Sequence, residues 1–326
     1  MKKIIFLLLI ATIGFTSCTN DEIEISYNTT FKVNPSTVIK PFTFEFNAGE
    51  LEGFSSNYKL RLRLLIYNSD GILVQEATDY FGNYATLMNA TLPLSPGKYT
   101  AIATSDIVKM SSNKISLEFW TLHDYKNLST TRLNDAGYIG QNKILGISKK
   151  EFTVSGQNDN IKIDVQPAGA LAYVIYRGVY NYSDVLSYEL LCTKVSEGCI
   201  FDEEGNYTTI EESNNNQYDW RISTIDVEDA TSKNMYEITY ILPTNNLNLK
   251  FHAWTEDEEY VAISNAMTIN PKAGEEYSFI MDIENLECTY GIVNGSNYSA
   301  PIIDKEDCRA TPTSTSGTIY LKNINQ

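Results

Sequence analysis

Histidine and cysteine, which most metal sites and many active sites require, are scarce in this chain. Its 326 residues include two histidines and five cysteines, and His123 and His252 lie far apart in the sequence. No His-Glu-x-x-His motif, EF-hand loop or Gly-x-Ser-x-Gly motif occurs. These absences argue against a zinc protease, an EF-hand protein and a serine hydrolase. We therefore expect no enzyme, no metal site and no cofactor, and we interpret His252, within an expected strand, as structural.

Acidic residues gather in two short runs, at residues 202–204 and 256–259. A retaining glycosidase needs two carboxylates about 5–5.5 Å apart, and oxygen-rich turns can also bind calcium. Both runs lie in polar segments between expected strands. We interpret them as solvated loop charges, with calcium binding as the main alternative.

Long apolar runs are missing beyond the N-terminus, so no membrane-spanning segment is expected there. At the N-terminus, two lysines precede an apolar run at residues 4–13, and small residues lead to Cys18. This order is typical of a secretory signal peptide, and a cysteine at the cleavage point is typical of a lipoprotein signal. We predict a signal peptide over residues 1–17 and lipidation of Cys18, although Phe15 stands where Leu, Val or Ile is usual. The alternative is an ordinary signal with an incidental cysteine.

The residues that follow Cys18 indicate where the lipoprotein goes. Asp21 and Glu22 lie close to the lipidated cysteine, which resembles the acidic export signal of Bacteroidales lipoproteins. We therefore expect a lipid anchor in the outer membrane that displays the chain at the cell surface, with a periplasm-facing location as the alternative. The polar tether, residues 18–30, is short.

Basic residues are outnumbered by acidic ones. The formal net charge is −16, and it becomes about −18 once the two signal-peptide lysines are removed. Such a charge argues against binding to nucleic acid and to an anionic membrane surface.

Four cysteines remain besides Cys18, namely Cys192, Cys199, Cys288 and Cys308. An even number in an exported protein is typical of disulfides. Three connectivities are open, and we favour the local pairs Cys192–Cys199 and Cys288–Cys308. Zinc is the rival interpretation, but no histidine lies close in sequence to either pair.

Alternating apolar and polar residues, interrupted by turns, dominate from Thr30 onward. The clearest alternation places Leu60, Leu62, Leu64 and Ile66 on one face of a strand. The Asn-Ser-Asp-Gly sequence at residues 68–71 then predicts a hairpin. Two strand series, separated by a polar stretch at residues 155–160, predict two β-sandwiches.

We predict an all-β chain with two tandem sandwiches. Its expected parts are the signal peptide 1–17, the lipidated tether 18–30, a first sandwich 31–155, a second sandwich 156–290 and a C-terminal tail 291–326.

Four segments carry a family resemblance. They are residues 62–74, 94–103, 160–165 and 169–174, which include the hairpin and a Pro-Gly-Lys-Tyr strand entry. With the lipoprotein start, they resemble the fimbrial anchor and fimbrillin-like lipoproteins of Bacteroidales, components of type V pili. The resemblance implies two transthyretin-like (Greek-key) sandwiches, a role in anchoring or building a fimbria (pilus), other fimbrial subunits as partners, and no catalytic residues. The family often has an arginine near the join, where this chain has Gln166 and Pro167.

An alternative function is glycan binding by a surface lipoprotein of a polysaccharide-uptake system. Trp120, Trp220 and Trp254 could stack on sugars. Because Trp120 and Trp254 lie in expected strands, we expect them in the core, which leaves Trp220 as the candidate sugar contact.

The C-terminal segment has strand propensity and no domain left to join. Thr318, Ile319, Tyr320 and Leu321 follow a Ser/Thr/Pro spacer. Such a strand can add to an open sheet edge of another subunit, as in the resembled pili. The alternative is that it folds back onto its own second sandwich.

Overall fold

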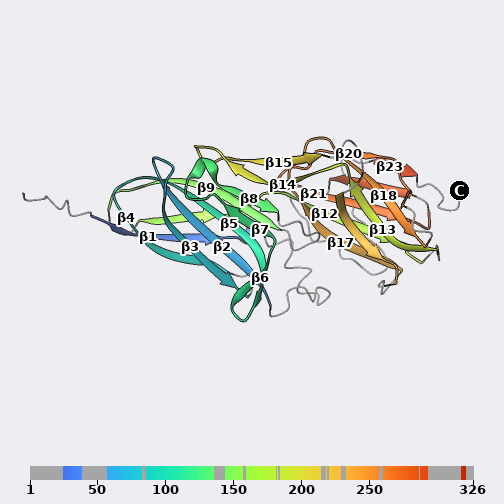
Figure 1. Ribbon diagram of the computed structural model, residues 1–326, viewed down its shortest axis with the longest axis horizontal. Helices are drawn as coiled ribbons and strands as arrows, with labels where there is room; N and C mark the ends of the chain where they lie inside the picture. The colour runs from blue at the N-terminus through green and yellow to red at the C-terminus, as the bar shows by residue number, and fades with distance from the viewer. Residues whose placement is uncertain are drawn as a thin grey trace, which may run out of the picture.

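The computed structural model describes residues 25–38, 57–82, 86–135, 144–156, 159–180, 182, 184–213, 218, 220–228, 233–256, 260–285, 287–292 and 317–320. Most of these residues lie in β-strands, and the all-β prediction is confirmed. In these ranges, no helix is long and apolar enough to cross a membrane. The molecule is elongated, with a sandwich at each end (Figure 1).

The first sandwich consists of two sheets. The smaller sheet has the order β10 (Asn160–Asp164), β1 (Tyr27–Asn34) and β4 (Met88–Leu94). The larger sheet has the order β11 (Gln166–Pro167), β9 (Leu145–Val154), β5 (Gly97–Ser111), β2 (Tyr58–Asn68) and β3 (Leu73–Phe81), with β6 (Lys114–Glu118) also paired to β5. Strand β1 pairs parallel to β10 and antiparallel to β4.

Strand β2 supplies much of the first core. Leu60, Leu62, Leu64 and Ile66 all face this core, as their spacing predicted. Full burial of such a side chain stabilises the fold by about 1.5–3 kcal/mol. The predicted hairpin after β2 is also confirmed, because Gly71 adopts a φ of 72° and its N–H donates to the Asn68 carbonyl at 3.0 Å.

The second sandwich also has two sheets. One has the order β17 (Asn234–Ile241), β12 (Ala170–Arg177), β21 (Glu276–Asp282), β22 (Glu287–Ile292) and β23 (Gly317–Tyr320). The other has the order β16 (Trp220–Asp226), β13 (Val185–Cys192), β18 (Leu247–Thr255) and β19 (Tyr260–Ala262), with β20 (Met267–Ile269) paired to β18. Tyr176, Phe251 and Phe279 are fully buried between these sheets.

A fifth sheet bridges the two sandwiches. This bridging sheet has the order β15 (Tyr207–Ser213), β14 (Lys194–Phe201), β8 (Arg132–Asp135) and β7 (Trp120–His123), and the 3-10 turn η2 (Leu128–Thr130) precedes β8. Its strands come from both predicted domains. A third hydrophobic cluster gathers Tyr67 of β2, Leu133 of β8, Phe201 of β14 and Tyr240 of β17. The larger sheet of the first sandwich is therefore covered on both faces.

The strand pairing does not follow the predicted boundary at residue 155. Strand β10 pairs with β1, and β11 pairs with β9, so residues 160–167 belong to the first sandwich. The polar stretch at residues 155–160 instead follows β9, and its last residue, Asn160, begins β10. The two sandwiches divide after Pro167, and the bridging sheet joins them again.

Candidate functional site

The C-terminal strand β23 lies at the edge of a second-sandwich sheet. It pairs antiparallel with β22, where Thr318 lies opposite Thr289 and Ile319 opposite Cys288. Thr318, Ile319 and Tyr320 are thus in the strand, and Leu321 lies outside the described residues. In this structure of the single chain, the strand lies on its own second sandwich. Its donation to another subunit stays a prediction.

The contact between β23 and β22 is short. It comprises four residue pairs, whereas β22 and β21 share six. A backbone hydrogen bond contributes a net 0.5–1.5 kcal/mol, by order of magnitude, so the strand is held by roughly a few kcal/mol. Without β23, the N–H and C=O groups along the outer edge of β22 would be free to bind another strand.

The predicted disulfide Cys192–Cys199 is wrong, because both cysteines are free thiols. Cys192 ends β13 and faces the core of the second sandwich, whereas Cys199 lies in β14 and faces the third cluster. The chain passes from one sheet to another at Thr193, which directs the two side chains into different cores. Cys288 is also a free, buried thiol. Its predicted partner Cys308 lies outside the described residues, as does Cys18, so the pair Cys288–Cys308 stays a prediction.

Burial also makes these thiols unreactive. It raises the pKa of Cys192 and of Cys199 to about 12, and it raises the pKa of Cys288 as well. Because the thiolate is the reactive form, these three cysteines pack as small apolar side chains.

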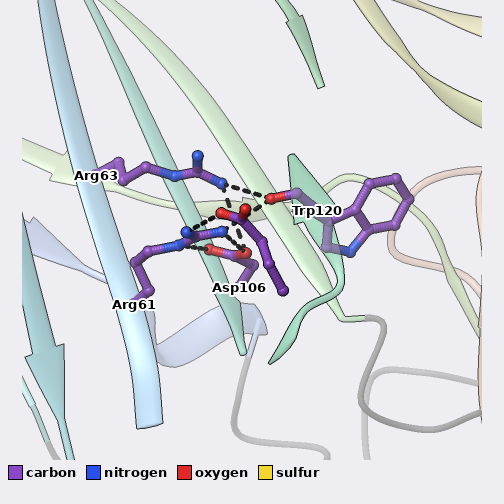
Figure 2. A network of polar contacts seen from close by, with 5 residues as sticks. Arg61, Arg63, Asp106 and Trp120 are labelled. Atoms are coloured by element: carbon purple, nitrogen blue, oxygen red, sulfur yellow. Dashed lines mark hydrogen bonds and ion pairs between the residues drawn. The ribbon is translucent and has the colours of Figure 1, made fainter. Parts of the chain in front are cut away.

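A buried ionic cluster lies on the other face of β2 (Figure 2). Arg61 and Arg63, which alternate with the core leucines, are 3% and 6% exposed. The Arg61 guanidinium donates from Nε to Asp106 Oδ1 at 2.9 Å and pairs from Nη2 with Asp106 Oδ2 at 2.5 Å. Arg61 also pairs with Glu118 of β6. Both arginines donate to the Trp120 carbonyl, at 2.9 Å from Arg61 and 3.3 Å from Arg63.

The two arginines are satisfied unequally. Burial lowers the pKa of Arg61, but Asp106 and Glu118 together outweigh burial and raise it above its usual value. Burial lowers the pKa of Arg63, whose nearest carboxylate oxygen lies at 3.5 Å and whose Nε has no hydrogen-bond partner among the described residues. Asp106 therefore holds two buried cations, and the cluster fixes the start of β7 against β2 and β5.

Alternation assigns the two arginines to solvent, so this cluster was not predicted. One signal of it was nevertheless present in the sequence. Leu65 and Tyr67 continue the same face as Arg61 and Arg63, and both are buried. When the residues at the end of a strand are apolar on both faces, other elements pack against both faces of the sheet.

The tryptophans do not form a sugar-binding platform. Trp120 is 2% exposed, as predicted. Trp220, the predicted sugar contact, packs against the core of the second sandwich opposite Cys192. Trp254, predicted to be core, is half-buried in β18.

Neither histidine lies in a metal cluster. His252 is 8% exposed, and burial lowers its pKa; His123 is exposed. No group of three or more His, Cys, Asp or Glu side chains that could hold a metal occurs among the described residues.

Comparison with known proteins finds likeness in structure only. No family model and no curated protein matches the sequence. A fimbrial assembly protein from Parabacteroides distasonis matches with 8% identity and a TM-score of 0.41, over 83% of this chain and 96% of that one. The tip fimbrial protein Mfa3 from Porphyromonas gingivalis matches with 11% identity and a TM-score of 0.39, over 82% and 99%.

Both neighbours are fimbrial proteins of Bacteroidales, the group of the lipoprotein family that the sequence resembles. At such low identity the likeness concerns the fold alone, and it assigns no role to this chain.

Proposed function

We propose that this chain is a non-enzymatic lipoprotein, held at the cell surface by a lipid on Cys18 in the outer membrane. It serves as an anchor or subunit of a fimbria, and it joins other subunits by strand addition. The observation that carries the proposal is the position of β23, a terminal strand on a sheet edge with four paired residues.

The direction of the chain supports this role. The first strand, β1, begins nine residues after Cys18, so a lipid there would keep the first sandwich close to the membrane. Strands β1 and β23 lie at opposite ends of the elongated molecule (Figure 1). The terminal strand would thus point away from the membrane, where an incoming subunit can reach it.

Strand addition between subunits requires that β23 leave β22. The four residue pairs with β22 hold the strand by roughly a few kcal/mol. If an incoming subunit offers a longer sheet edge, the new backbone hydrogen bonds would more than offset the loss of this pairing. Strand β23 would then complete the neighbour's sheet, and the β22 edge would be open to a strand from a further subunit.

Truncation after Ala310 tests the role of the strand. The truncated chain should keep both sandwiches and bind a synthetic peptide of residues 317–326, measured by fluorescence anisotropy, while a scrambled peptide of the same composition should not bind. A peptide with Pro in place of Ile319 is the second control, because proline removes a backbone donor. Equal binding of all three peptides would contradict strand addition.

Deletion of the gene in the source bacterium separates this function from the glycan-binding alternative. A fimbrial anchor or subunit predicts fimbriae that are lost or shed into the medium, with unchanged growth on polysaccharides. A glycan-binding lipoprotein predicts intact fimbriae and slower growth on one polysaccharide.

A further inference from the structure

A long hairpin leaves the second sandwich and lies across the first. It comprises β14, a turn at residues 202–206 and β15, and we call it the strap (residues 194–213). Figure 1 shows it as the yellow-green pair of strands along the upper side of the molecule, between the two sandwiches. The strap follows β13 and precedes β16, so both of its ends are rooted in the second sandwich.

The root of the strap is fixed by side-chain hydrogen bonds. Ser196 Oγ donates to the Pro243 carbonyl at 2.7 Å, and Thr209 Oγ1 donates to the same carbonyl at 2.9 Å. Pro243 follows β17, so the strap is tied to the second sandwich through both of its strands.

The middle of the strap pairs with the first half of the chain. In the bridging sheet, Gly198 lies opposite Asn134 and Cys199 opposite Leu133. A Cβ at Gly198 would lie 2.4 Å from the Leu133 carbonyl oxygen, closer than any real Cβ contact. The cross-domain pairing therefore requires glycine at this position.

The tip of the strap rests on the larger sheet of the first sandwich. Lys149 Nζ donates to the Glu204 carbonyl at 3.0 Å and lies 3.2 Å from Asn206 Oδ1. Gly205, with a φ of 82°, turns the chain directly above Thr100 and Lys149. The Asp202 carboxylate accepts the Asn206 N–H at 2.8 Å, which closes the turn.

The strap also contributes apolar side chains to the cluster between the sandwiches. Cys199 and Phe201 are 0% and 2% exposed, and they share the third cluster with Tyr67 and Leu133. The Phe201 N–H donates to the Thr131 carbonyl at 3.1 Å. Without the strap, apolar side chains of this cluster that contact Cys199 and Phe201 would be exposed to solvent.

We propose that the strap couples the two sandwiches into one cooperatively unfolding unit. Domains in one chain move and unfold separately unless their interface is large and apolar. Here Tyr173 and Tyr240 of the second sandwich already lie in the third cluster. The strap adds Cys199 and Phe201 to that cluster, and it also adds the strand pairing with β8 and the hydrogen bonds from Lys149 at its tip. This inference is independent of the fimbrial role.

Calorimetry and hydrogen exchange on the full chain in detergent test the proposal. Wild-type protein should show one transition. Gly198→Ala should split it into two and raise amide exchange in β7 and β8 by tenfold or more, while exchange in β18 stays unchanged. Gly156→Ala is the matched control, because nothing lies within 4 Å of its added Cβ, and it should behave as wild type.

A single transition in Gly198→Ala, with faster exchange confined to β14 and β15, would overturn the proposal. If that variant does not fold, Lys149→Ala is the second test, since it removes the tip contacts and, besides them, an ion pair with the exposed Glu151. Its faster exchange should reach β7 and β8, and an effect limited to residues 202–206 would contradict coupling through the strap.

Discussion

Asp106→Asn should destabilise the protein more than any other single conservative change in the ionic cluster. Asp106 is fully buried and is the carboxylate that both arginines contact. Asparagine keeps the shape of the side chain but removes its charge and one of its acceptor oxygens. Arg63 would then lose the one carboxylate that pairs with it among the described residues, and Arg61 would keep only Glu118.

The expected loss of folding free energy is large because the arginine charges would stay buried without their carboxylate partner. Removing one partner of a buried ion pair costs about 3–5 kcal/mol. For a unit of 150–250 residues, each kcal/mol lowers the melting temperature by about 2–4 °C. The two coupled sandwiches form a somewhat larger unit, so the melting temperature should fall by an amount in the lower part of the range of about 6–20 °C. Glu118→Gln is the matched control, because the Glu118 side chain is 30% exposed and Arg61 keeps both of its contacts with Asp106, so this variant should lose less stability.

Urea unfolding followed by tryptophan fluorescence measures both variants, since Trp120 adjoins the cluster. The interpretation would be refuted by an Asp106→Asn variant that unfolds within about 1 kcal/mol of wild type, or no earlier than Glu118→Gln.

Three further outcomes are expected. Burial raises the pKa of Glu276 from 4.5 to about 7, so between these pH values the folded chain holds a proton that the unfolded chain has released. The free energy of unfolding should therefore fall as pH rises from 4.5 to above 7, by about 1–2 kcal/mol after allowance for solvent screening. Glu276→Gln should flatten this pH dependence in urea titrations, and an unchanged slope would contradict the assignment. Cys192, Cys199 and Cys288 should resist maleimide in native protein and react in urea, and protection that persists in urea without reductant would instead indicate disulfides. Cys18→Ala should abolish labelling by a fatty-acid probe, and continued labelling would disprove the anchor.

Local patterns predicted the parts of the fold that depend on neighbours in sequence. The core face of β2 follows from alternation at Leu60 to Ile66, and the hairpin at Gly71 follows from its turn residues. Both are set by the backbone geometry of a few adjacent residues.

Long-range pairing decided the features that the sequence did not predict. Because β10 pairs in parallel with β1, the division between the sandwiches lies after Pro167 and not at residue 155. No pattern in the residues near this point indicates that pairing. Arg61 and Arg63 are buried because β7, which begins at Trp120 far along the chain, packs against them. The wrong Cys192–Cys199 disulfide has the same origin, because six intervening residues were expected to form one hairpin, whereas the chain changes sheets at Thr193.

The fate of β23 in the living cell tests the fimbrial proposal most directly. A photo-crosslinking amino acid at Thr318 would sample the neighbour of this strand in fimbriae of the source bacterium. Strand addition predicts a covalent adduct between this chain and a second fimbrial subunit, identified by mass spectrometry. Crosslinks that form only to this chain's own β22, around Thr289, would contradict it.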